Sequence, residues 1–136
     1  MTAMIKAVID TNVLVSGLWT HDPESPTKKI LWALLNDDFE FFLNDRIVAE
    51  YADVLNRKKF GFDSEEVGRL IEHIRLAGRT LQPKHVEELF PDPDDRVFYE
   101  VALAEPDTHL VTGNLKHYPV SPIVVSPAQF CELLGI

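Results

Sequence analysis

Cysteine and long apolar runs are scarce in this chain of 136 residues, and each scarcity excludes a class of protein. Cys131 is the only cysteine, so the chain has no internal disulfide and no CxxC zinc site. Its longest apolar run is Ile30–Leu35, far below the roughly 20 residues that a membrane-spanning helix needs. The first residues, Met-Thr-Ala-Met-Ile-Lys, lack the basic and apolar regions of a signal peptide. We therefore expect a cytoplasmic protein that has no contact with a membrane.

Positive charge is also scarce. Thirteen Lys and Arg oppose 22 Asp and Glu, giving a formal net charge of -9. This balance argues against a protein that coats nucleic acid by charge alone. It favours basic protein partners or metal ions. Because 46% of the residues are hydrophobic, the chain has the composition of a globular protein.

Short apolar segments alternate with helical patterns along the chain. We expect strands at 5–9, 39–43, 109–112 and 123–125. We expect helices at 13–19, after an N-cap at Ser25, from Asp45, from Ser64 to Gly78, from Asp92, and at 127–134. This alternation predicts an α/β fold whose parallel sheet is covered by helices. The length predicts a single domain over 1–136, and periodicity leaves the strand order open.

Polar residues follow two of the predicted strands. Asp10, Thr11 and Asn12 come after the first, whereas Thr112 and Asn114 lie at the end of the strand at 109–112. Ligands of open parallel sheets gather beyond the carboxyl ends of the strands. An ionised Asp beside a buried run needs a partner or a metal ion. The alternative role of Asp10 is to cap the next helix.

Further along, Glu50 lies on the flank of an apolar helical stripe. At 100° per residue this stripe gathers on one side of the predicted helix, and it comprises Ile47, Val48, Tyr51, Val54 and Leu55. Glu50 is therefore held beside the core and can reach an edge of the sheet, whereas Asp53 points outward. The alternative is a surface glutamate that pairs with Arg46 or Arg57.

The segment Asp92-Pro93-Asp94-Asp95 begins another predicted helix. Asp is favoured in a first helical turn, so we assign Asp92 to capping. Asp95 flanks the apolar stripe of the helix and is expected to face the sheet, while Asp94 lies about 100° away and faces solvent. Spacing alone does not settle which of the two would bind a ligand.

Together these segments predict a cluster of Asp10, Glu50, Asp95 and Asn114. Packed carboxylates repel one another unless they are protonated or bridged by a cation. Oxygen donors without cysteine or paired histidine select Mg²⁺ or Mn²⁺ over zinc. Such ions serve phosphoryl chemistry because they bind phosphate oxygens and activate water.

These motifs resemble those of PIN-domain nucleases, in order and over nearly the whole chain. Val-Ile-Asp-Thr-Asn at 8–12 resembles the opening of that family, and the segments around Glu50, Asp95 and Asn114 resemble its later acidic motifs. The residues at 123–130 are similar to its C-terminal end. The resemblance implies a PIN-like α/β/α sandwich with a central parallel sheet. It also implies a Mg²⁺- or Mn²⁺-dependent endoribonuclease that hydrolyses RNA phosphodiester bonds.

The resemblance also implies roles for individual residues. Asp10, Glu50 and Asp95 would be the metal ligands, and Asn114 would complete the catalytic set where many members have a further Asp. That difference would remove a negative charge and weaken one metal site, although the Asn oxygen could still bind a metal ion or hold a metal-bound water. Thr11, Asn12 and Thr112 match positions that support these acids by hydrogen bonding. The most similar branch contains toxins of type II toxin–antitoxin pairs, which implies an antitoxin partner and a homodimer.

Several nearby residues could help to bind RNA. Arg57, Lys58 and Lys59 end the helix that carries Glu50, and they could guide a strand to the site. Their alternative role is to offset the helix dipole. Phe60 and Phe62 are the best candidates for base stacking. We expect only a local structural role for His117.

Two other functional classes remain. The chain could be an inactive PIN-like subunit that only binds partners, and Asn114 is the feature that favours this alternative. It could also be an aspartyl phosphatase of the haloacid dehalogenase type, which also has Asp after its first strand. That chemistry needs a second acid two residues later, where this chain has Asn12.

Overall fold

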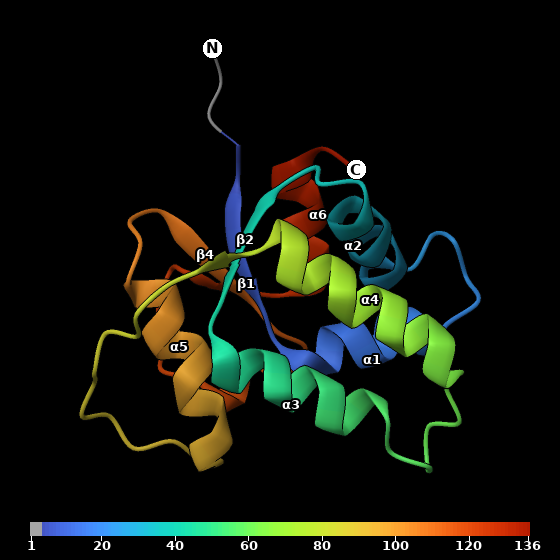
Figure 1. Cartoon of the computed structure of the whole chain (residues 1–136). Coiled ribbons are helices and arrows are strands. Elements are labelled where there is room, and N and C mark those ends of the chain that lie inside the picture. The colour runs from blue at the N-terminus through green and yellow to red at the C-terminus, as the bar shows by residue number, and fades with distance from the viewer. Residues whose placement is uncertain (1–3) are drawn as a thin grey trace.

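A five-stranded parallel sheet lies at the centre of the computed structural model, which describes residues 4–136 (Figure 1). Residues 1–3, where the segment examined for a signal peptide begins, lie outside the described residues. The strands follow the spatial order β3-β2-β1-β4-β5. Their bounds are Lys6–Ile9 for β1, Glu40–Leu43 for β2, Arg79–Thr80 for β3, Thr108–Val111 for β4 and Val124–Val125 for β5.

Strand β1 is the central strand, and its composition fits that place. Ala7, Val8 and Ile9 are all buried, as expected for a strand covered on both faces. In the parallel pairing of β1 with β4, Ile9 lies opposite Val111. The next residues, Asp10 and Thr112, therefore emerge at the same edge of the sheet.

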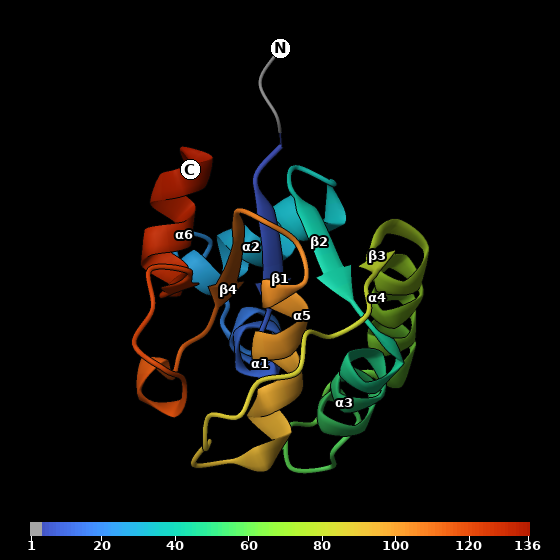
Figure 2. The ribbon, with the colours of Figure 1, turned by 90° about the vertical axis from the view of Figure 1, so that its left-hand side faces the viewer.

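Helices cover both faces of this sheet, which confirms the predicted α/β/α architecture (Figures 1 and 2). Helix α5 (Arg96–Leu103) lies on one face, and α1, α2, α4 and α6 lie on the other. Helix α3 runs past the carboxyl ends of the strands, between α4 and α5. The remaining bounds are Thr11–Trp19 for α1, Pro26–Leu35 for α2, Asp45–Leu55 for α3, Ser64–Ala77 for α4 and Pro127–Leu134 for α6.

The structure corrects several details of the sequence prediction. Helix α1 begins at Thr11, two residues before the predicted start, so it follows Asp10 directly. Ser25 occupies the N-cap of α2, but its hydroxyl contacts Thr27 Oγ1 at 3.1 Å and caps no backbone N–H. Strand β3 was not predicted because its two residues are exposed and polar. Within residues 4–136, none of the helices is both long and apolar enough to cross a membrane.

Candidate active site

Asp10 directly follows the central strand and is buried at the carboxyl edge of the sheet, with 4% of its surface exposed. Its backbone N–H donates to the carbonyl of Val111 at 2.9 Å, which continues the pairing of β1 with β4. Its Oδ2 accepts hydrogen bonds from Thr112 Oγ1 at 2.9 Å, Tyr118 Oη at 2.9 Å and Asn12 Nδ2 at 3.2 Å. The carboxylate is thus fixed in one orientation through a single oxygen.

Burial raises the pKa of Asp10 above its ordinary value, although the hydrogen bonds from Thr112 and Tyr118 act in the opposite direction. Burial, followed by the charge of Asp10, also raises the pKa of Tyr118. Tyr118 therefore keeps its phenolic proton and remains a donor. The site holds a carboxylate in a poorly solvated position where charge is costly, and a nearby cation would offset that cost.

Glu50 reaches the site from helix α3. The Asn44 side chain caps this helix by accepting from the backbone N–H of Ile47 at 2.9 Å. The apolar stripe that includes Ile47 and Val48 is buried, which leaves Glu50 half-buried on its flank, as predicted. Burial raises the pKa of Glu50, and the charges of Asp94 and Asp53 raise it further.

Tyr51 connects helix α3 to the central strand. Its hydroxyl donates to the backbone carbonyl of Ile9, the residue that precedes Asp10. This bond joins the neighbour of Glu50 to the neighbour of Asp10 and so fixes the two acidic residues relative to each other. The sequence predicted Tyr51 only as part of the apolar stripe. Because a buried tyrosine generally needs a hydrogen-bond partner, its hydroxyl could have indicated this contact as well.

Asp95 ends a short 3-10 helix, η1 (Pro93–Asp95), which precedes α5. As predicted, Asp92 caps this turn, with its Oδ1 accepting from the Asp94 N–H at 3.0 Å. Asp94 is exposed, whereas the Asp95 side chain is only 15% exposed. Burial, then the charge of Asp10, raises the pKa of Asp95 to about 6.

His117 contacts Asp95, with its Nδ1 3.2 Å from Asp95 Oδ2. It belongs to the 3-10 helix η2 (Leu115–His117) that follows β4. A proton on His117 lowers the pKa of Asp95 and partly offsets the effect of burial. His117 and Tyr118 thus hold two of the acidic residues. The sequence carries no signal of these contacts, because both depend on the path of the chain after β4.

The hydrogen bonds of Thr11, Asn12 and Thr112 differ from one another. Thr112 and Asn12 both donate to Asp10, and Asn12 Oδ1 accepts from the Gly113 N–H at 3.0 Å. Thr11 makes no such contact through its side chain: Oγ1 is buried and has no hydrogen-bond partner among the described residues. Thr11 is the first residue of α1, and its side chain lines the pocket.

Asn114 lies at the rim of the site. Its backbone N–H donates to Thr112 Oγ1 at 3.0 Å, which links it to the network around Asp10. The residue is exposed and lines the same pocket as the acidic side chains. The structure therefore brings all four predicted catalytic positions, Asp10, Glu50, Asp95 and Asn114, to one pocket.

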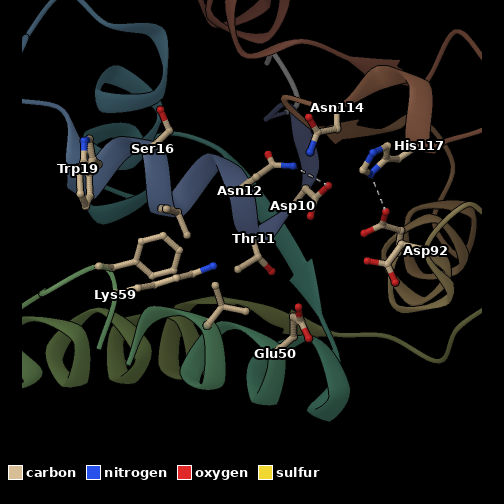
Figure 3. Close-up of a pocket in the computed structure, with 14 residues that line it drawn as sticks. Asp10, Thr11, Asn12, Ser16, Trp19, Glu50, Lys59, Asp92, Asn114 and His117 are labelled. Carbon is tan, nitrogen blue, oxygen red and sulfur yellow. Dashed lines mark hydrogen bonds and ion pairs between the residues drawn. The ribbon is translucent and has the colours of Figure 1, made fainter. Parts of the chain in front are cut away.

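This pocket has a volume of about 640 Å³, within the usual range of roughly 300–1,000 Å³ for ligand sites. Figure 3 shows Asp10, Asn114 and His117 at one end, Glu50 below, and Trp19 with Lys59 toward the other end. Of the three predicted basic residues, Lys59 lines the pocket. Arg57 instead pairs with Asp53 at 3.0 Å, and Lys58 is exposed.

Arg96, the first residue of α5, binds the segment 86–90 that precedes Asp92. Its guanidinium donates to the carbonyls of Val86 and Glu88 at 2.5 and 2.6 Å. It also lies 5.1 Å from the centre of the Phe90 ring. Arg96 therefore helps to position the loop that leads into η1 and Asp95.

The donor set fits a hard divalent cation in its chemistry. Three carboxyl groups with raised pKa values line a single pocket together with Thr11, whose buried hydroxyl has no hydrogen-bond partner among the described residues. A hydrated Mg²⁺ or Mn²⁺ would stabilise the carboxylates. Among residues 4–136, no three side chains of His, Cys, Asp or Glu are already close enough together to coordinate one ion directly. Water would therefore complete the shell, as is usual for Mg²⁺.

A family model described as "PIN domain" matches residues 6–116, which include Asp10, Glu50, Asp95 and Asn114. No curated protein sequence matches the chain.

Proposed function

Because the chain belongs to the PIN-domain family, whose members are generally nucleases that use divalent metals, we propose that it is a Mg²⁺- or Mn²⁺-dependent endoribonuclease. We take residues 1–136 as one PIN domain. The observation that carries the proposal is the convergence of Asp10, Glu50 and Asp95 on one pocket at the carboxyl edge of the sheet. Their raised pKa values support a site where negative charge is costly without a cation.

Asp10, Glu50 and Asp95 would hold the ion together with water molecules that complete its shell. When bound, such an ion polarises a phosphate and lowers the pKa of a water nucleophile. Thr112 and Tyr118 hold the Asp10 carboxylate in a fixed orientation. Tyr51 fixes the position of Glu50 relative to Asp10 through its bond to Ile9, and His117 contacts and orients Asp95. Asn114, at the rim, is placed to contact either a metal-bound water or the substrate.

We further propose that the enzyme acts in the cytoplasm as the toxin of a toxin–antitoxin pair, forms a homodimer and is blocked by a cognate antitoxin. The net charge of -9 supports a basic antitoxin segment. Asn114 still favours the alternative of a weakly active interaction subunit. The phosphatase alternative has lost its support, because the Asn12 amide donates to Asp10 and cannot act as the second acid.

The decisive experiment is cleavage of a panel of RNAs with and without Mg²⁺ or Mn²⁺ by wild type and Asp10→Asn. We expect Asp10→Asn to lose at least about 99% of the activity, since it removes a charge at the reaction centre. Its melting temperature should not fall, because the buried charge is removed while the shape is kept.

Asp38→Asn, at an exposed turn before β2, is the matched control and should cut like wild type. Cleavage by Asp10→Asn at the wild-type rate would show that Asp10 is not part of the machinery. Failure of the wild type to cut any RNA with either metal would favour the interaction subunit.

A further inference from the structure

Three aromatic side chains form a cluster next to the acidic residues. The rings of Phe60 and Phe62 are stacked, with centroids 5.6 Å apart and an interplanar angle of 12°. Trp19 meets both rings edge-on, at 6.4 Å from Phe60 and 6.2 Å from Phe62. The aromatic cluster therefore joins the end of α1 to the loop that follows α3.

This aromatic cluster is open to solvent. Trp19 is 59% exposed, and Phe60 and Phe62 are only partly covered. A tryptophan that served only the core would be largely buried, because exposing its ring forfeits the apolar area it could bury. The cluster therefore presents aromatic surface that nothing in the described chain covers.

The aromatic cluster and the carboxylates share one pocket. Trp19 and Phe60 line the same cavity as Asp10 and Glu50. Figure 3 shows Trp19 at the end opposite to Asn114 and His117. A ligand that extends from the acidic end would therefore reach an aromatic wall.

Lys59 supplies a positive charge beside the aromatic cluster. It is the one lysine or arginine among the pocket-lining residues in the described part of the chain. Its Nζ lies 5.1 Å from the centre of the Phe60 ring, a cation–π arrangement that holds the ammonium group beside the cluster. An ammonium group here is suited to a phosphate of a strand that crosses the pocket.

We propose that Trp19 and Phe60, supported by the stacked ring of Phe62, stack an unpaired base of a single-stranded RNA. Lys59 contacts the RNA backbone next to the phosphate that lies at the acidic end. The proposal rests on the proposed nuclease function and adds to it a base-stacking site and the residues that form it. Only an unpaired base can present its face to an aromatic side chain, so the site would favour single strands over duplexes.

Binding can be measured without cleavage by combining each variant with Asp10→Asn. The probe is a fluorescently labelled single-stranded RNA of about ten nucleotides, a length typical of such binding sites. We expect Trp19→Ala to weaken binding about tenfold, the cost of losing one stacked base. A duplex of the same sequence should bind more weakly than the single strand to the unsubstituted parent.

Trp32→Ala is the matched control, since Trp32 is 48% exposed and lines a different pocket. It should bind RNA like the parent. Because the chain has two tryptophans, this variant leaves Trp19 as the sole one, and RNA should quench its fluorescence. In Trp19→Ala, the fluorescence of Trp32 should not respond.

Replacing single nucleotides of the probe with abasic ones adds a test that misfolding cannot imitate. At one position, the abasic nucleotide should weaken RNA binding by the parent protein, which has Trp19. The same abasic RNA should bind Trp19→Ala no more weakly than the intact RNA does. Equal RNA binding by Trp19→Ala and its parent would overturn the proposal. A change in the self-association of Trp19→Ala would show instead that the aromatic cluster forms a contact between copies of the protein. An RNA that is bound with this pattern but never cut by the wild type would leave stacking intact and refute the nuclease function instead.

Discussion

Asp10, Glu50 and Asp95 share one property: burial makes each of them harder to ionise than a carboxyl group in water. The effect is reinforced because the groups repel one another, as Asp10 does Asp95. Hydrogen bonds from Thr112 and Tyr118 only partly offset it at Asp10. Ionisation of these groups therefore lowers the free energy of unfolding, which is common at functional sites.

Substitution of Asp95 tests this cost through the pH dependence of stability. Its pKa is about 6 in the folded chain, against an ordinary value of 3.8 for Asp, so the folded state binds this proton more tightly. That stability is complete below pH 3.8 and is lost as pH rises through 6. We expect Asp95→Asn to exceed wild type by about 1 kcal/mol in free energy of unfolding at pH 7, after allowance for solvent screening.

The measurement is denaturant unfolding in chelator from pH 4 to 8. Asp38→Asn, at an exposed position before β2, should follow the wild-type curve. A wild-type pH dependence in Asp95→Asn would show that Asp95 does not titrate in this range.

Glu50 can be tested against a neighbour on the same helix. Glu50 lines the pocket, while Asp53 lies one turn further on and pairs with Arg57 at the surface. We expect Glu50→Gln to lose at least about tenfold in cleavage rate with an unchanged melting temperature, since it removes one of the charges proposed to hold the ion. Asp53→Asn should retain the wild-type rate, and full activity in Glu50→Gln would remove Glu50 from the site.

At the level of elements, the position of α1 determines both ends of the pocket. Helix α1 begins directly after Asp10 and ends at Trp19. It packs closely on α2 at Gly17, where an added Cβ would lie 2.8 Å from the carbonyl oxygen of Thr27. The hydroxyls of Ser16 and Thr27, 2.9 Å apart, connect the same two helices.

Gly17→Ala should therefore destabilise the protein. A backbone carbonyl cannot yield easily, so we expect a loss of about 1–3 kcal/mol in free energy of unfolding. Gly68→Ala is the matched control in α4, where the new methyl group meets no atom within 4 Å. That substitution should stabilise the protein by about 0.5–1 kcal/mol through helix propensity. Denaturant titration of both variants would decide, and equal effects would contradict close packing at Gly17.

The elements that could be predicted from sequence are those with a strong apolar pattern. The stripe around Ile47 correctly predicted α3 and the place of Glu50 on its flank. Strand β3 has no apolar residue, so only its pairing with β2 reveals it. Tyr118 and His117 could not be assigned to the site, because their contacts depend on the strand order and on the path of the chain after β4.

The whole molecule has a net charge of -9, and part of this negative charge is concentrated in the pocket, which is lined by Asp10, Glu50, Asp92 and Asp95. A divalent cation that binds only the folded state stabilises it by mass action, about 2.7 kcal/mol at a concentration of 100 Kd. We expect Mn²⁺ to raise the melting temperature of wild type and to have a smaller effect on Asp10→Asn. The measurement is thermal unfolding with and without Mn²⁺, with Asp38→Asn as control. An equal rise in all three proteins would mean that the ions bind elsewhere on the acidic surface.

The hydrogen bonds of Asp10 span most of the chain, since its partners Thr112 and Tyr118 follow it by 102 and 108 residues. During translation, Asp10 is made about a hundred residues before the groups that orient it, which arrive only when synthesis has passed Tyr118. A nascent chain on the ribosome, or a fragment cut before β4, therefore has no assembled carboxylate site. For the proposed ribonuclease, this order of synthesis delays RNA cleavage until translation has passed Tyr118.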